Sequence, residues 1–511
     1  MALLVALFFL AVYFFTANQL FSFDAVTNAI AAERSDLIRW FHPNHLLYPF
    51  LGALWHKIER LFSYEGYAIY SLARFNSIMA AAGLGIFAHA LSRWIPRGKA
   101  MIAAAFLGST WAVWHFAVDG RAVGITIFFS SLILWRLIEL TKKETGSIGD
   151  AVILWDLSSL YIFSHAIAIF HIVPVAWFLA KRSGKPALML YVGNTLVTVA
   201  IVYVAVYATL GLPFTPDGFF SWALGYAGVA GTGNALNSPY WTQSLTEGVL
   251  GLWHGFCNAF LLPTKGEWQT MFVAHSVGGL FVIALLTAAS RIKTADARDK
   301  ILFWALTAWG LLVTLFLALW SPGQEGFRLH VIVPWTAALV IAFKDVKPVF
   351  QAGALLAALL FSLNLSGPIY AGANIKNNIG YQTLAEIDAQ IKPGDTLLAG
   401  TGQSIPGYDV LRPYFFPNMG GGTLSGWLLL SGQNNFDALA ADFGQKLKNG
   451  RTVYWTAELL EPALQERLER NFKLEPNAVS KLTSAFETKQ AFMLSNGTGI
   501  YEIVKTNNEP Q

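Results

Sequence analysis

The chain has 511 residues, of which 55% are hydrophobic and 13% charged, and its formal net charge is +4. Soluble domains carry about 25% charged residues, so the composition excludes an ordinary soluble protein, and we expect no nucleic-acid partner. The single cysteine, Cys257, excludes an intramolecular disulfide.

Apolar runs recur along the first 365 residues, and a helix crosses a bilayer with roughly 20 residues. The first run has no basic region before it and no clear cleavage site after it, so we interpret it as a retained helix. The fifth and sixth runs could instead be bent or unequal helices. We predict about eleven spans, at 2–17, 67–91, 100–117, 122–140, 150–163, 166–180, 187–210, 270–289, 301–320, 330–343 and 348–364.

Lysine and arginine gather in alternate loops between these spans. The basic loops are 93–99, 142–143, 181–185, 291–300 and 344–347. The intervening segments are poorer in basic residues, and they are 18–66, 118–121, 164–165, 211–269 and 321–329. Basic loops of membrane proteins face the cytoplasm. We therefore expect a multi-pass inner (plasma) membrane protein, with its N-terminus inside and its C-terminal domain outside.

The composition changes near Gly367, where charge rises and long apolar runs stop. We predict two domains, a transmembrane domain over 1–365 and a soluble extracytoplasmic domain over 366–511. Residues 396–399, 452–455 and 500–504 read as strands, and Glu458–Phe472 as an amphipathic helix. This pattern predicts a small α/β domain. Gly400-Thr401-Gly402 is interpreted as a simple turn, because a lone Gly-x-Gly is a weak nucleotide-binding signal.

Polar side chains collect on the face predicted to be external. They are Asp24, His42, His45, Asp119, Arg121, His165, Glu325, Arg328 and His330. A polar turn at a membrane surface is ordinary for any one of them, but charges that enter helix ends are costly and usually have partners. A carboxylate there can act as a general base on a hydroxyl acceptor. Arginine and histidine can hold a phosphate such as that of a lipid-linked sugar.

Five segments resemble the GT-C superfamily of polytopic glycosyltransferases, close to its protein mannosyltransferase and aminoarabinose transferase branch (family 39-like). They are Phe21–Asp24, an acidic residue opening the first external loop; His42–Trp55, a histidine- and proline-rich stretch; Ala73-Arg74; Trp111–Arg121; and Phe327–Pro334. The resemblance covers roughly residues 1–345 in order and spacing. It implies an α-helical polytopic membrane fold of about eleven transmembrane helices, with a small C-terminal α/β domain.

The resemblance also implies roles for individual residues. Asp24 would be the catalytic base or would orient the acceptor. The donor phosphate would bind Arg74, Arg121 and Arg328. The cleft would be lined by His42, His45, Asp119, His165, Glu325 and His330. Two positions depart from the family pattern: Ala25 replaces a second acidic residue, which argues against a divalent metal cofactor, and Leu329 replaces an aromatic residue.

The implied activity is transfer of a sugar from a polyprenyl-phosphate donor to a lipid, glycan or protein acceptor outside the cytoplasm. Two other functions stay open. A transporter or flippase of lipid-linked substrates would place polar residues near mid-membrane, where only Asp156 and His171 lie. An assembly protein would bind a partner through the external domain and would need no clustered carboxylate.

Overall fold

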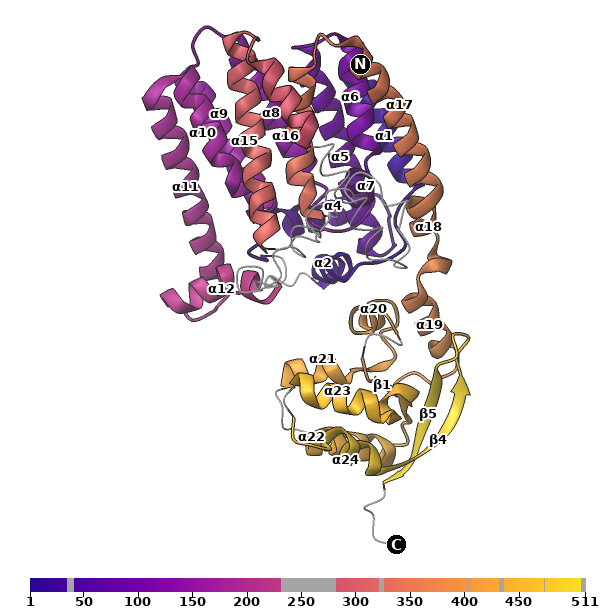
Figure 1. Cartoon of the computed structure of the whole chain (residues 1–511). Helices are drawn as coiled ribbons and strands as arrows, with labels where there is room; N and C mark the ends of the chain where they lie inside the picture. Colours follow the sequence, from indigo (N-terminus) through magenta and orange to yellow (C-terminus); the bar gives the residue numbers. More distant parts are fainter. Residues whose placement is uncertain are drawn as a thin grey trace. The chain divides into compact units, whose positions relative to one another are not determined.

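A computed structural model describes residues 1–34, 41–230, 282–320, 326–401, 405–431, 436–472 and 474–506. These residues form two compact units (Figure 1). The helical unit comprises residues 1–18 and 27–373, and the α/β unit comprises residues 19–26 and 374–511. Glu325 lies outside the described residues, as does most of the predicted span 270–289.

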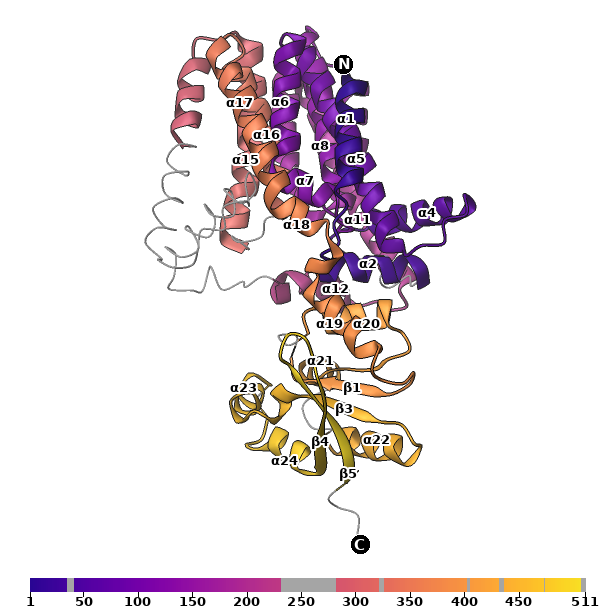
Figure 2. The same cartoon turned by 90° about the vertical axis from the view of Figure 1, so that its right-hand side faces the viewer.

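The helical unit is built from long helices that lie side by side (Figures 1 and 2). Its α-helices are α1 (Ala2–Phe15), α4 (Leu47–Leu61), α5 (Ala68–Ser92), α6 (Arg97–Ser109), α7 (Trp111–Ala117), α8 (Thr126–Lys142), α9 (Ile148–Ser164), α10 (Ile172–Arg182), α11 (Gly184–Thr209), α12 (Pro216–Ala230), α15 (Ala297–Trp320), α16 (Leu329–Ala342) and α17 (Lys347–Asn364). Two 3-10 turns, η1 (Ala166–His171) and η3 (Gly326–Arg328), precede α10 and α16. Helix α2 (Phe23–Arg34) crosses the division between the units.

The described helices are those of a membrane protein. By length and composition, four segments are able to cross a bilayer unaided: Ala68–Ser92, Gly184–Thr209, Ala297–Ala318 and Lys347–Gly372. The bent pair α6–α7 could be a fifth, and Ala2–Phe15, Val282–Ile292 and Gly326–Ala342 are shorter apolar helices. The predicted helical membrane architecture is confirmed, whereas the count of eleven spans stays a prediction.

The third predicted span, 100–117, is not one helix. Its two halves, α6 and α7, meet at an angle of 68°. Thr110 between them has extended backbone angles (φ −67°, ψ 145°), and its hydroxyl donates to the Leu107 carbonyl. An extended residue interrupts the helical hydrogen-bond ladder, and it directly follows Gly108 and Ser109, a Gly/Ser pair of the kind at which helices kink.

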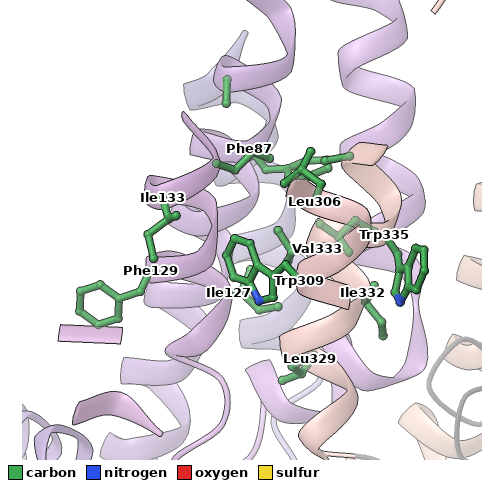
Figure 3. Close-up of a cluster of buried hydrophobic side chains, with 14 of the residues drawn as sticks. Phe87, Ile127, Phe129, Ile133, Leu306, Trp309, Leu329, Ile332, Val333 and Trp335 are labelled. Carbon is green, nitrogen blue, oxygen red and sulfur yellow. The ribbon is translucent and has the colours of Figure 1, made fainter. Parts of the chain in front are cut away.

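The core of the helical unit lies between α5, α8, α15 and α16 (Figure 3). Trp309 is 1% exposed in this cluster, beside Leu306 and Val333. Outward-facing residues are also apolar: Leu3 on α1, Ile201 on α11 and Leu355 on α17 are 61–74% exposed. Apolar side chains on both sides of a helix are what a lipid-embedded bundle requires.

The α/β unit holds one five-stranded sheet in the order β2-β1-β3-β5-β4. The strands are β1 (Thr396–Ala399), β2 (Gly420–Thr423), β3 (Val453–Thr456), β4 (Phe486–Met493) and β5 (Gly499–Thr506). β1 pairs in parallel with β2 and β3, while β5 is antiparallel to β3 and β4. The helices are α19 (Ile379–Asp388), α20 (Tyr408–Phe415), α21 (Leu424–Ser431), α22 (Phe436–Lys448), α23 (Pro462–Phe472) and α24 (Ala478–Ser484).

The predicted α/β class is confirmed, and the three predicted strands correspond to β1, β3 and β5. The predicted helix 458–472 begins late: residues 457–460 form a 3-10 turn, and α23 starts at Pro462. A proline favours the first helical position because its missing N–H is not needed there. Two strands were not predicted. β2 is Gly-Gly-Gly-Thr, and β4 is mostly exposed and polar.

Candidate functional site

The loops of the helical unit gather at two ends. At one end, here called the basic end, ion pairs and hydrogen bonds join the predicted basic loops. Arg93 Nε lies 3.0 Å from Glu139, and Asp299 accepts hydrogen bonds from Trp94 (2.7 Å) and Lys344 (2.6 Å). The alternation of basic and non-basic loops therefore corresponds to a separation in space.

The other end, here called the polar end, brings together residues 41–46, 115–121, 165–166 and 326–330. The Ala166 N–H donates to the Asn44 carbonyl at 2.7 Å. The His165 ring lies 5.1 Å from the Phe327 ring. Segments far apart in sequence thus converge, and they carry most of the predicted site residues.

One turn at the polar end has all of its carbonyls held in place. Residues 117–121 start at the last residue of α7, and their five consecutive carbonyl oxygens accept hydrogen bonds from outside the turn. The donors are the Ser77 hydroxyl to Ala117 (2.9 Å), the Asn18 N–H to Val118 (3.1 Å), the Asn76 amide to Asp119 (2.5 Å) and Arg121 (2.7 Å), and the Tyr48 hydroxyl (2.9 Å) and Asn28 amide (3.4 Å) to Gly120. We call this segment the pinned turn.

The pinned turn presents an acidic and a basic side chain side by side. Arg121 Nε donates to Asp119 Oδ2 at 2.7 Å, and an Arg121 terminal nitrogen lies 2.6 Å from His115 Nε2. The Asp119 side chain is 2% exposed and that of Arg121 is 23% exposed. The guanidinium also lies 4.4 Å above the Phe116 ring. A fixed backbone therefore orients a nearly buried carboxylate toward a partly accessible guanidinium.

Arg328 lies beside the pinned turn. It ends η3, and its side chain is 1% exposed. A Cβ on Gly326 would fall 2.7 Å from the tip of the Phe116 ring, so only glycine allows this close approach. Phe116 consequently contacts both the Arg121 guanidinium and the turn that carries Arg328. Guanidinium groups donate strong, directional hydrogen bonds to phosphate oxygens, which makes this region suited to an anionic group.

Four histidines form a continuous column at the polar end. Successive ring centroids of His42, His45, His165 and His330 lie 4.6, 5.8 and 4.9 Å apart. The column ends at Tyr161, whose hydroxyl lies 2.8 Å from His330 Nδ1. Sequence reasoning proposed these four histidines as cleft residues but did not find Tyr161.

His42 and His45, the first two histidines of this column, are neutral near pH 7. Burial lowers the pKa of His42 to about 4. Burial, and then the neighbouring rings of His42 and His165, lower the pKa of His45 well below its usual value. His42 Nδ1 accepts the Asn44 N–H, so the neutral ring carries its proton on Nε2. Such rings can donate hydrogen bonds to hydroxyl or phosphate oxygens but supply no positive charge.

A second buried polar chain lies deeper in the helical unit. His171 Nε2 lies 2.7 Å from the Ser158 hydroxyl, which lies 3.0 Å from the Tyr191 hydroxyl. All three residues are fully buried. His171 also stands 5.4 Å from the Trp309 ring. Asp156, the other residue expected near mid-membrane, is exposed on α9.

Arg74 is not part of the polar cluster described above. Two of its nitrogens donate to Glu59 at 2.7 and 2.6 Å, and its guanidinium lies 4.3 Å from the Tyr64 ring. Burial alone would raise the pKa of Glu59, but hydrogen bonds from Arg74 and Ser71 outweigh it and hold that pKa below its usual value. This ion pair joins α4 to α5, and the predicted phosphate role of Arg74 stays a prediction.

Asp24 is exposed in the first turn of α2 and belongs, with residues 19–26, to the α/β unit. Its predicted catalytic role stays a prediction. Among the described residues, no group of three or more His, Cys, Asp or Glu side chains is arranged to hold a metal ion. The residues that sequence reasoning missed are His115, Asn76, Tyr48 and Tyr161. Asn76 carries a usable signal, because an amide inside an apolar span needs partners.

No protein-family model and no curated protein matches the sequence. Solved structures do show similarity. ArnT from Cupriavidus metallidurans in the apo state is 14% identical, with a TM-score of 0.47 over 100% of this chain and 99% of that one. The Archaeoglobus fulgidus oligosaccharyltransferase is 13% identical (TM-score 0.49; 97% and 72% covered). The mycobacterial arabinofuranosyltransferase AftD is 12% identical (0.49; 99% and 40%).

Proposed function

We propose that this chain is a membrane glycosyltransferase, which moves a sugar from a polyprenyl-phosphate donor to an acceptor on the extracytoplasmic face. The observation that carries the proposal is the pinned turn, which fixes Asp119 and Arg121 next to the segment bearing Arg328. The polar end lies opposite the basic end, and the basic end of a membrane protein faces the cytoplasm. The sugar donor would therefore reach the polar end as a lipid-linked molecule within the membrane.

The donor phosphate would bind between Arg121 and Arg328. Arg121 is 23% exposed and would divide its donors between Asp119 and the phosphate. Hydrogen bonds between guanidinium and phosphate are strong and directional. The histidine column would offer neutral N–H donors to the sugar, and its hydrogen bond to Tyr161 would fix the orientation of the His330 ring. The aliphatic stems of the arginines would pack in apolar surroundings while their heads reach the phosphate.

Asp24 is the proposed base. It would accept the proton of the acceptor hydroxyl as that oxygen attacks the anomeric carbon, and the polyprenyl phosphate would leave. Asp119, which is nearly buried and bonded to Arg121, would hold that guanidinium in place. General base catalysis contributes about 10²–10⁴-fold in rate, so the loss of the base has a large effect.

The test is transfer by the purified protein from a polyprenyl-phosphate sugar, with a nucleotide sugar as the comparison donor. Asp24→Asn should lower transfer by at least about 100-fold, because the amide cannot accept the proton. The matched control is Asp442→Asn, which removes a carboxylate from a surface ion pair with Lys446 in the α/β unit. Wild-type turnover in Asp24→Asn would remove Asp24 from the mechanism. Activity with a nucleotide sugar and no lipid carrier would reject the proposed donor.

A transporter is the second candidate, and the buried chain His171–Ser158–Tyr191 favours it. Ionisable residues buried among membrane helices often line a substrate or proton path. His171→Ala separates the two functions. If the protein is a transferase, this variant keeps transfer per folded molecule. If it is a transporter, wild type moves the substrate across the membrane of proteoliposomes without sugar transfer. The variant then loses this movement.

A further inference from the structure

An apolar groove opens at the basic end between α6, α16 and α17, three helices that stand together in Figure 2. Its volume is about 330 Å³. Every lining residue is apolar except Thr336, and those used below are Ile102, Phe106, Leu339, Phe350, Gly353 and Leu356. The groove belongs wholly to the helical unit and is separate from the polar end.

Basic side chains lie one to two helical turns from the groove, toward the starts of α6 and α17. Helices α6 and α17 both begin at the basic end, with Arg97 and Lys347 as their first residues. A Cβ on Gly353 would lie 3.6 Å from Ile102, so the two helices touch five and six residues from these starts. At 1.5 Å per residue, both cations lie about 8–9 Å along the helix axes from that contact.

Lys99 links the cations to the apolar lining. Its ammonium lies 4.8 Å from the ring of Phe350, a groove residue, and it donates to the Lys344 carbonyl. The framing segments 97–99 and 343–347 hold four cations and one carboxylate, Asp345. Asp299 on α15 pairs with Lys344, which leaves a net charge of +2. Within the described part of the chain, neither Arg97 nor Lys347 takes part in an ion pair, and both are exposed.

The starts of α6 and α17 add to this positive potential. Neither helix has a side-chain cap, and neither carries an acidic residue in its first turn. Helix N-termini carry partial positive charge and favour anions. Basic residues placed there are unfavourable unless an anion compensates them. An apolar groove beneath such a site calls for a ligand with an anionic head and an apolar tail.

We propose that this groove binds an anionic glycerophospholipid, with an acyl chain between α6, α16 and α17 and its phosphate near Arg97 and Lys347. Basic pockets between membrane helices on the cytoplasmic side are suited to anionic head groups. Charge complementarity selects an anionic over a zwitterionic lipid, and the apolar lining excludes free phosphate as a sufficient ligand. This site is independent of the proposed glycosyl transfer.

The experiment measures lipid binding to the full-length protein in non-ionic detergent by native mass spectrometry. Dioleoyl-phosphatidylglycerol is compared with dioleoyl-phosphatidylcholine, and inorganic phosphate serves as a competitor. Each basic residue near a membrane surface changes anionic-lipid binding about 5-fold. Arg97→Ala with Lys347→Ala should therefore weaken phosphatidylglycerol binding about 30-fold and leave phosphatidylcholine binding unchanged.

Two further variants separate the groove from general surface charge. Lys181→Ala with Lys185→Ala removes two exposed cations from the basic end beside the uncapped start of α11, away from the groove, and should leave binding unchanged. Gly353→Leu fills the groove and should abolish retention of phosphatidylglycerol; the Cβ that it adds would lie 3.6 Å from Ile102, an ordinary contact distance. The site would be overturned if the two lipids bound equally or if the control variant lost as much binding as the Arg97/Lys347 variant. Unchanged binding in Gly353→Leu, or full competition by inorganic phosphate, would also overturn it.

Discussion

The two ends of the helical unit handle polarity in opposite ways. At the basic end, long charged side chains form ion pairs near the surface, such as Arg93 with Glu139, where the arginine side chain is 51% exposed. At the polar end, short or planar groups are buried and bonded, such as Asp119 at 2% exposed and His330 at 0%. Exposed ion pairs contribute about 0–1 kcal/mol, whereas a buried polar group left unsatisfied costs about 1–3 kcal/mol.

The two ends thus serve different purposes. The exposed charged side chains of the basic end orient the protein in the membrane, whereas the buried polar groups of the polar end form a site. Exposed lysines and arginines need only the correct side of the bilayer, so they tolerate exchange and movement. The pinned turn needs particular donors at particular distances, such as Asn76 at 2.5 Å from the Asp119 carbonyl. Substitutions at the polar end should therefore affect activity, and those at the basic end should affect orientation or stability.

The largest expected effect concerns orientation and is all-or-none. We expect a cysteine at Ser147, in a basic-end loop, to be labelled only from the cytoplasm. A cysteine at Gln511 should be labelled only from outside, because the basic loops fix the topology. The measurement is labelling of intact cells with a membrane-impermeant maleimide, in a background where Cys257 is replaced by serine. Equal labelling of both positions from outside would overturn the assignment of the two ends.

Arg328→Ala should weaken donor use by roughly 10- to 150-fold. The proposed charge-assisted contact with phosphate contributes about 1.5–3 kcal/mol, and its loss should appear as a higher KM or a lower kcat/KM. The matched control is Arg136→Ala, which removes a partly buried arginine from the Asp150 pair at the basic end. If donor kinetics were unchanged in both Arg328→Ala and Arg121→Ala, the proposed phosphate site would be wrong.

Asn76→Ala should lower transfer about 10-fold, because the carbonyls of Asp119 and Arg121 would lose their donor and the pinned turn would loosen. Asn364→Ala is the matched control. Asn364 is also a fully buried asparagine, and its amide donates to the Ser109 carbonyl at 2.9 Å. Both variants should lower the melting temperature, but only Asn76→Ala should lower transfer per folded molecule. Equal activity losses would mean that the turn has no special role.

The smallest expected effect is a pH dependence of stability at Glu59. Its folded pKa lies below its unfolded value, near 4.5. Its stabilising contribution is therefore complete above that value and is lost as the pH falls through the folded pKa. Glu59→Gln should melt about 2 °C lower than wild type at pH 7, and the gap should close as the pH falls through the folded pKa of Glu59. A gap that widened on acidification would contradict this assignment.

Much of the fold follows from strong, simple signals. Apolar length located α5, α11 and α17 to within three residues, because crossing a bilayer sets a minimum run of apolar side chains. The break at Thr110 was missed because the span was assigned from its apolar length, although Gly108, Ser109 and Thr110 interrupt the run. Strand β2 was missed because three of its four residues are glycine, a poor strand former.

The candidate site was only partly predictable. Charged and histidine residues at loop positions, such as Asp119 and His165, are visible in sequence because they interrupt apolar runs. Their partners Tyr48 and Tyr161 lie inside helices and carry no such signal, whereas the amide of Asn76 inside an apolar span could have been recognised. Counting spans shows which loops share an end of the helical unit. The contacts between side chains depend on the rotation and tilt of each helix, and a sequence pattern does not record these.

The order of the residues in the pinned turn bears on how the protein is made. The donors to the turn that are named above, from Asn18 to Ser77, all precede their acceptors at 117–121 in the chain. Ribosomal synthesis runs from the N-terminus, so the receiving surface exists before the turn emerges. The turn can then bind to donors on segments that are already in the membrane, before the later spans are made. A chain permuted to begin after Ser77 would reverse this sequence, and the polar end would have to assemble around an unsupported loop.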